Sequence, residues 1–386
     1  MMAGPRVLIW VQHLLGVGHL HRAASICRAL LRQGATPLLV SGGLPDPTLH
    51  GIDGIGFVQL APARARDATF KILLDINGEV VTEEWKSTRS TMLQDVVNNF
   101  APDMVITELF PFGRRQMRFE MMPLLQMLRG MPNRPLIFCS VRDILVDRGK
   151  PQHDVDSITW LQEYFDAALV HGDPSVIAFE NTFPMAEKIR HMLIYTGYIA
   201  EQHVIPYTEA GIDEVLVSAG GGAVGMALFQ AAIAARPLTM ARDKTWRILV
   251  SPLENPHNIT TLREKAPRGV IIEPVRPDFP GMLHHCLLSI SKAGYNTMME
   301  TLGGGTRAVV VPFVGGNETE QALRAALLAK RGLMHMLPEP EMTPQTLAAI
   351  VDHALASPKP DPTAIRLDGA EETARCIRAE IEKHRR

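Results

Sequence analysis

The sequence contains few cysteines, and the four that it has are far apart in a chain of 386 residues: Cys27, Cys139, Cys286 and Cys376. No two of them form a CxxC pair, so we expect no zinc site and a reducing compartment. The sequence also lacks an excess of one charge, because 39 Lys and Arg face 41 Asp and Glu. A polyanionic partner such as nucleic acid would therefore need a local basic patch.

Long apolar runs are absent as well. No segment reaches the roughly 18 apolar residues that a membrane-spanning helix needs. The first apolar run ends at Gln12 after about six residues, which is too short for the core of a signal peptide. With 46% hydrophobic and 21% charged residues, the composition is that of a soluble protein, and the length predicts about two domains. We expect a cytoplasmic location.

Short apolar runs alternate with helix-like segments in the first half of the chain. Residues 19–33 have apolar side chains at helical spacing, and Gly34 ends that segment. The alternation predicts βαβ units around a parallel sheet. The runs that we interpret as buried strands are 6–11, 103–108, 135–141 and 167–172.

The same rhythm starts again after residues 195–198, with a strand, a glycine-rich turn and a helix over 214–235. We therefore predict two doubly wound α/β domains. Residues 1–198 form the first domain and residues 199–365 the second. Residues 366–386 form a charged helix that crosses back to the first domain.

The loop GVGHLHR at residues 16–22 connects the first strand to its helix. It is not the dinucleotide fingerprint, because His21 stands where a third glycine is required. A flavin or nicotinamide oxidoreductase is therefore a rival and not the preferred hypothesis. Gly16 and Gly18 permit a tight turn with backbone amides facing a ligand. His19 either lies at a reacting centre or only begins a helix.

Two further stretches suggest a ligand site in the second half. The loop SAGGGAVG at 218–225 precedes a helix, so the amides around Gly221 and Gly222 could hold a diphosphate; a flexible turn is the alternative. The stretch 291–325 carries Glu300 and Glu320 in what we expect to be the first turns of two helices. The patterns Thr297-x-x-Glu300 and Asn317-x-x-Glu320 would also suit simple helix caps.

In combination these motifs resemble glycosyltransferase family 28. The glycine-rich loop at 218–225 falls where that family has one, and GVGHLHR resembles the first loop of some of its branches. Residues 291–335 are similar to its C-terminal domain in the order of a small-residue turn, an acidic helix residue, a Pro-Phe pair and an E/Q-Q pair: Ser291, Ala293 and Gly294, then Glu300, then Pro312 and Phe313, then Glu320 and Gln321.

This resemblance implies a GT-B fold, in which two Rossmann-like domains face a cleft and the second domain binds a nucleotide sugar. Glu300 would accept hydrogen bonds from the ribose hydroxyls, and backbone near Val275, Arg276 and Asp278 would contact the base. Glu320 and Gln321 would contact the sugar, and Gly221 and Gly222 would approach the diphosphate or the sugar. The same resemblance places Gly294, Asn296 and Thr297 at the donor.

The chain departs from the family pattern at two places. In the members of this family that act on the lipid-linked peptidoglycan precursor, a glutamine stands at the position of Glu320, and the turn that corresponds to 197–202 carries an arginine for the diphosphate, which is absent here. These departures bear on the identity of the sugar and on the contacts to the diphosphate.

The function that we expect is a metal-independent, inverting glycosyltransferase with no cofactor. Its donor would be a nucleotide sugar, most simply UDP-linked, and its acceptor a glycan or a lipid-linked sugar of the cell envelope. His19, or Glu108 as the alternative, would remove the acceptor proton, and Arg22 would pair with a carboxylate. Asp154 and Asp156 are expected to begin a helix and not to bind a metal.

Other hypotheses remain open. An epimerase or hydrolase of nucleotide sugars, or a non-catalytic nucleotide-sugar-binding subunit, could use the same fold. Arg114, Arg115 and Arg118 lie among apolar residues and could contact an anionic inner membrane surface. The alternative for this segment is a helix whose arginines are merely solvated.

Overall fold

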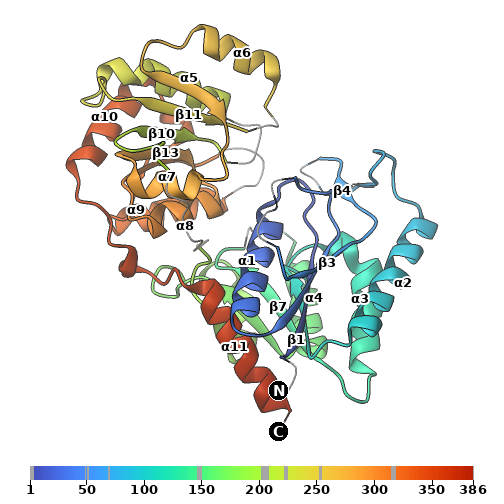
Figure 1. The fold of residues 1–386 in the computed structure, drawn as a ribbon. Helices are drawn as coiled ribbons and strands as arrows, with labels where there is room; N and C mark the ends of the chain where they lie inside the picture. Colours follow the sequence, from blue (N-terminus) through green and yellow to red (C-terminus); the bar gives the residue numbers. More distant parts are fainter. Residues whose placement is uncertain are drawn as a thin grey trace. The chain divides into compact units, whose positions relative to one another are not determined.

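A computed structural model of the chain divides into two compact units, Met1–Ile199 with Asp368–Arg386, and Ala200–Leu367. Each unit is built on a parallel β-sheet flanked by helices (Figure 1). The residues that the structure describes are 4–47, 49, 52–67, 70–145, 150–200, 208–220, 225–251, 254–313 and 319–385.

The sheet of the first unit has seven parallel strands in the order β3-β2-β1-β6-β7-β8-β9. The chain first builds outward from β1 to β3 and then continues on the other side of β1 with β6. Ligands of open α/β sheets bind at such a reversal, beyond the carboxyl ends of the strands. The strands are β1 Arg6–Val11, β2 Thr36–Ser41, β3 Gly56–Gln59, β6 Met104–Glu108, β7 Leu136–Arg142, β8 Ala167–His171 and β9 Leu193–Tyr195, and a separate hairpin pairs β4 Arg64–Ala65 with β5 Leu73–Leu74.

Both faces of this sheet are buried, which explains why its strands are continuous apolar runs. Along β1, Leu8 and Trp10 join one core while Val7, Ile9 and Val11 join the other. The first core is covered by α2 Glu83–Phe100, α3 Arg118–Arg129 and α4 Pro151–Tyr164, and the second by α1 Gly18–Arg32 and α11 Gly369–His384.

The C-terminal helix α11 packs against α1, and Figure 1 shows the two ribbons side by side in red and blue. Ile377 and Ile381 are buried in the same core as the apolar face of α1. At the helix start, Glu371 accepts hydrogen bonds from Arg32 Nε at 2.9 Å and Gln33 Nε2 at 3.0 Å. The last segment of the chain is thus an integral part of the first unit.

The second unit has six parallel strands in the order β12-β11-β10-β13-β14-β15, with its reversal between β10 and β13. Its strands are β10 Val215–Ser218, β11 Trp246–Val250, β12 Val270–Pro274, β13 Leu288–Lys292, β14 Ala308–Val311 and β15 His335–Met336. Its α-helices are α5 Met226–Ala235, α6 Pro256–Glu264, α7 Phe279–His285, α8 Tyr295–Gly303, α9 Glu320–Lys330 and α10 Pro344–Ala356. Short 3₁₀ helices of the two units span Arg115–Met117, Phe179–Asn181, Pro184–Met192, Arg236–Leu238, Glu339–Glu341 and Pro362–Ala364.

Candidate active site

The reversal point of the first sheet brings together His19 and Glu108. Gly18 is the first residue of α1, so His19 lies in the first turn of that helix, beyond the carboxyl end of β1. Glu108 is the last residue of the neighbouring strand β6. The two side chains meet with His19 Nδ1 at 2.8 Å from Glu108 Oε1, and the histidine side chain keeps 15% of its surface exposed while the glutamate keeps 1%.

Glu108 is surrounded by donors. Arg22, one turn further along α1, forms an ion pair with it, and Ser140 Oγ donates to Glu108 Oε2 at 2.6 Å. Burial alone would raise the pKa of Glu108, but the Arg22 guanidinium and the hydrogen bonds from His19 and Ser140 outweigh burial and hold that pKa well below its ordinary value. Glu108 is therefore a carboxylate at neutral pH, and its role is to accept hydrogen bonds.

An ionised Glu108 fixes the tautomer of His19. A carboxylate has no proton to donate, so Nδ1 of His19 must carry the hydrogen, and Nε2 keeps its lone pair. Arg22 Nη2, 3.2 Å from the same Nδ1, cannot donate to it as well. Burial, followed by the positive charges of Arg114 and Arg142, lowers the pKa of His19 well below its usual value. A neutral histidine with an available Nε2 is the form that a general base requires.

The rest of GVGHLHR surrounds this pair. A Cβ atom built on Gly16 would have no neighbouring atom within 4 Å, so the loop leaves open space there. His21 turns elsewhere, because its Nε2 lies 2.8 Å from Asp46 Oδ2. Of the two loop histidines, only His19 contacts Glu108 within the described residues.

Sequence reasoning missed the polar residues behind Glu108. Ser140 and His171 are completely buried on β7 and β8, and Ser140 Oγ lies 2.8 Å from His171 Nε2. The signal that could have found them is a serine and a histidine near the carboxyl ends of otherwise apolar strands, LIFCSVR and AALVH.

The three arginines expected at a membrane differ in their surroundings. Arg114 is 7% exposed, and its Nε donates to Gln12 O at 2.6 Å. Arg115 pairs with Asp156, whereas Arg118 is exposed. Within the described residues, no helix combines the length and apolar character needed to cross a membrane. Contact with a membrane surface stays a prediction, and of the three arginines Arg118 is the one that solvent reaches most.

In the second unit, Glu300 lies in the middle of α8. The helix begins at Tyr295 after Gly294, which has no side chain to cap it. Our expectation that Glu300 lies in the first turn is therefore wrong, and so is the alternative in which Thr297 and Glu300 form a capping pair. Glu300 is partly buried, and burial raises its pKa to about 7. Its carboxyl group forms no hydrogen bond or ion pair with any of the described residues. A carboxyl group in this situation can accept hydrogen bonds from a ligand.

The next two donor candidates, Glu320 and Gln321, form contacts within the second unit. Glu320 is the first residue of α9 and forms an ion pair with the buried Arg324 at 2.8 Å. Gln321 Oε1 accepts a hydrogen bond from Phe313 N at 3.2 Å. The first contact lies within α9, and the second connects the start of α9 to Phe313, two residues after β14.

The remaining donor candidates lie near the carboxyl ends of β12 and β13. Arg276 forms an ion pair with Asp278 at 2.7 Å, and Val275 is 41% exposed. Gly294 has open space around it, Asn296 is partly buried and Thr297 is buried. The candidates Gly221 and Gly222, and the presumed cap Asn317, lie outside the described residues.

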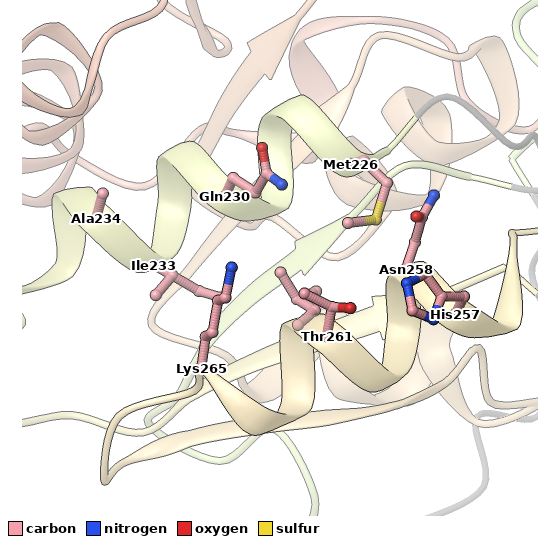
Figure 2. A pocket seen from close by; sticks show the side chains of 9 residues that line it. Met226, Gln230, Ile233, Ala234, His257, Asn258, Thr261 and Lys265 are labelled. Atoms are coloured by element: carbon pink, nitrogen blue, oxygen red, sulfur yellow. The ribbon is translucent and has the colours of Figure 1, made fainter.

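A cavity of about 410 Å³ lies between α5 and α6 of the second unit. In Figure 2 the side chains of Gln230 and Met226 from α5, of Thr261 from α6 and of Lys265, the residue after α6, line it. None of the predicted donor residues is among its nine lining residues, so this cavity is distinct from the predicted donor site.

Two Rossmann-like units, each with a parallel sheet and its reversal point, define the GT-B fold. Two solved structures are similar in fold to nearly the whole of this chain, each at 14% sequence identity. MurG of Acinetobacter baumannii matches with a TM-score of 0.58 over 98% of this chain and 99% of its own. A putative UDP-N-acetylglucosamine 2-epimerase of Listeria monocytogenes matches with 0.60 over 99% and 98%. At this identity the likeness establishes the fold and does not separate these activities.

The second unit can be identified more closely. Residues 227–375 match the glycosyltransferase family 28 C-terminal domain, so the resemblance drawn from residues 291–335 is confirmed. A UDP-N-acetylglucosamine–N-acetylmuramyl-(pentapeptide) pyrophosphoryl-undecaprenol N-acetylglucosamine transferase of Agrobacterium fabrum is 27% identical over 158 residues, 40% of this chain. The alignment spans 42% of that relative.

Proposed function

We propose that this protein is a glycosyltransferase that moves a sugar from a nucleotide donor, most simply UDP-linked, to a glycan or lipid-linked acceptor. The observation that carries the proposal is the family 28 domain, in which Glu300 is a carboxyl group without a partner among the described residues. The relative's name supports the donor and acceptor classes, since that name includes a UDP-linked sugar and a lipid-linked sugar.

On the donor side, the carboxyl group of Glu300 would accept hydrogen bonds from the two ribose hydroxyls, which favour its ionised form. The backbone near Arg276 and Val275, a residue that is 41% exposed, would contact the base. The diphosphate would bind near the N-termini of α5 and α8, because unpaired backbone amides and the helix dipole favour an anion there. The same amides would stabilise the diphosphate as it leaves, so no metal is required.

On the acceptor side, His19 Nε2 would take the proton from the acceptor hydroxyl. The hydroxyl oxygen forms its bond to the anomeric carbon while the bond from that carbon to the diphosphate oxygen breaks. The electron pair leaves with the nucleoside diphosphate, and attack from the opposite face inverts the anomeric centre. Glu108 stabilises the imidazolium that forms, because its negative charge lies against the Nδ1 hydrogen.

This assignment gives the first unit the acceptor and the base, and the second unit the donor. It also makes Glu108 the orienting partner and not the base, since Arg22 and Ser140 already occupy its oxygens. We further propose that the protein acts at the cytoplasmic face of the cell membrane, where Arg118 would contact anionic lipid.

The first prediction tests the base. His19→Ala should lower kcat by about 10²–10⁴, the range for losing a general base, while the affinity for the donor changes little. His21→Ala is the matched control because His21 pairs with Asp46 and should give a mild effect. Steady-state kinetics would follow release of the nucleoside diphosphate. Near-normal turnover of a folded His19→Ala protein would remove His19 from the mechanism.

The second prediction tests the donor site. Glu300→Ala should weaken UDP binding by about 1–3 kcal/mol, the cost of losing a charged hydrogen-bond acceptor. Titration calorimetry measures this, and circular dichroism checks that α8 is intact. Wild-type affinity in the folded variant would reject the ribose role of Glu300. Incubation with the UDP-sugar alone separates the rivals, since an epimerase or hydrolase would convert it without an acceptor.

A further inference from the structure

A chain of buried polar side chains runs behind Glu108, on the side away from His19. Ser140 on β7 is paired with Glu108 of β6 in the strand register, and its Oγ contacts both Glu108 Oε2 at 2.6 Å and His171 Nε2 at 2.8 Å. His171 Nδ1 in turn lies 2.8 Å from Thr196 Oγ1. All three side chains behind the carboxylate are 0% exposed.

Every hydrogen bond in this chain has a fixed direction. Because Glu108 is ionised, Ser140 must donate its only hydrogen to it, and the Ser140 oxygen must then accept from His171 Nε2–H. His171 Nδ1 therefore accepts from the Thr196 hydroxyl. Burial, together with the nearby positive charge of Arg22, lowers the pKa of His171 to about 3, so the ring is neutral and can serve as donor and acceptor at once.

Burying this polar network is unfavourable in free energy, and the packing of the sheet does not require it. Buried polar groups gain little over apolar residues of the same shape, and each one becomes unfavourable if its partner is lost. A strand position in an otherwise apolar sheet would be filled more simply by valine or alanine. The network is oriented toward one atom, Glu108 Oε2, and the other oxygen of that carboxylate holds His19.

We propose that Ser140 and His171 are positioning residues, which hold the Glu108 carboxylate so that it keeps His19 in the Nδ1–H tautomer. Without the Ser140 hydroxyl, the carboxylate can rotate and give both oxygens to Arg22. His19 then loses its fixed acceptor, and part of the population carries its hydrogen on Nε2. That tautomer has no lone pair at the atom that must accept the proton. The catalytic meaning of this inference rests on the proposed function, whereas the tautomer itself does not.

NMR of the full-length protein with ¹³C,¹⁵N-labelled histidine tests the tautomer without any substrate, because the ring ¹⁵N and ¹³Cδ2 shifts distinguish the two forms. We expect wild-type His19 to be the Nδ1–H form at pH 7.5, and Ser140→Ala and His171→Phe to show an Nε2–H fraction. His171→Gln should retain the wild-type shifts, because its amide nitrogen can replace Nε2–H as the donor to Ser140. The shifts are to be compared at one pH, since Arg22, Arg114, Arg142 and Glu108 also act on His19.

Ser41→Ala is the matched control. Ser41 is a serine at the carboxyl end of β2, 1% exposed, whose hydroxyl has no hydrogen-bond partner within the described residues. The control should leave the His19 shifts unchanged. Unchanged His19 shifts in a folded Ser140→Ala protein would overturn the proposal.

Kinetics supply the second readout. Ser140→Ala should lower kcat by on the order of 10–100-fold, by analogy with the loss of a residue that orients a metal-binding histidine, with an unchanged KM for the donor. His171→Gln should recover most of the activity lost in His171→Phe. A wild-type protein without transferase activity would contradict the proposed function alone, since the NMR result decides the positioning role independently.

Discussion

The pKa of the Glu300 carboxyl group, raised to about 7 by burial, couples the stability of the second unit to pH. In the unfolded chain the same group has an ordinary value of 4.5. A raised pKa means that the folded state favours the protonated form. The contribution of the Glu300 carboxyl group to the free energy of unfolding is therefore complete below pH 4.5 and is lost as the pH rises through 7.

We therefore expect Glu300→Gln to raise the melting temperature relative to wild type at pH 8.5, and much less at pH 5. The upper bound is on the order of 3 kcal/mol, because one pKa unit corresponds to about 1.4 kcal/mol. Thermal melts across pH 5–8.5 measure the difference. The control is Glu264→Gln, at an exposed glutamate of α6. A difference between Glu300→Gln and wild type that does not grow with pH would contradict the assigned burial of the carboxyl group.

Individual residues also show what the sequence could and could not predict. The histidine of GVGHLHR could be singled out because glycines and a helix start flank it. Its contact with Glu108 could not, because 89 positions separate the two and only the strand order brings them together. Arg114 looked like a surface charge, yet its backbone at φ 58° turns the side chain onto Gln12 O, a feature of the fold and not of local composition.

At the scale of elements, a buried ion pair connects two helices to the sheet. Arg89 of α2 donates to Glu120 of α3 at 2.6 Å, and both side chains are 0% exposed. Trp10 of β1 donates to the same carboxylate at 3.1 Å, and Arg89 also donates to Ala61 O at 2.7 Å. The buried charge of Arg89 or of Glu120 is compensated only as long as the other side chain is present.

Arg89→Met should lower the free energy of unfolding of the first unit by about 3–5 kcal/mol, because it leaves a buried carboxylate without its counter-charge. The double variant Arg89→Met with Glu120→Gln should be less destabilised than Arg89→Met, since no charge remains buried. Urea unfolding followed by tryptophan fluorescence measures both, as Trp10 and Trp85 are close to the pair. Equal stability of the single and double variants would mean that packing, and not the charge, sets the cost.

The elements themselves were largely predictable. The apolar runs at 6–11, 103–108, 135–141 and 167–172 correspond to β1, β6, β7 and β8, because strands buried on both faces need apolar residues at every position. The edge strand β3 gives no such signal, since two of its four residues are exposed. The start of α8 was misplaced because Thr297 and Glu300 match a cap pattern, whereas the helix already begins at Tyr295 and includes both residues.

At the scale of the whole molecule, the path of the chain decides which parts share stability. The chain builds most of the first unit, then the whole second unit, and returns with α11 to complete the core beneath α1. A defect in the last twenty residues should therefore weaken the first unit and not the second, although the second unit is nearer in sequence.

Two large-to-small variants test this expectation. Ile377 on α11 and Leu347 on α10 are both 0% exposed, in the cores of the first and second unit respectively. Each change to alanine should cost about 2–5 kcal/mol. Hydrogen–deuterium exchange should then show faster exchange in α1 for Ile377→Ala, and in α5 and α10 for Leu347→Ala. UDP should still slow exchange in the second unit of Ile377→Ala, because a ligand stabilises the state that binds it. Faster exchange of α5 in Ile377→Ala would show that the two units unfold together and that α11 supports both.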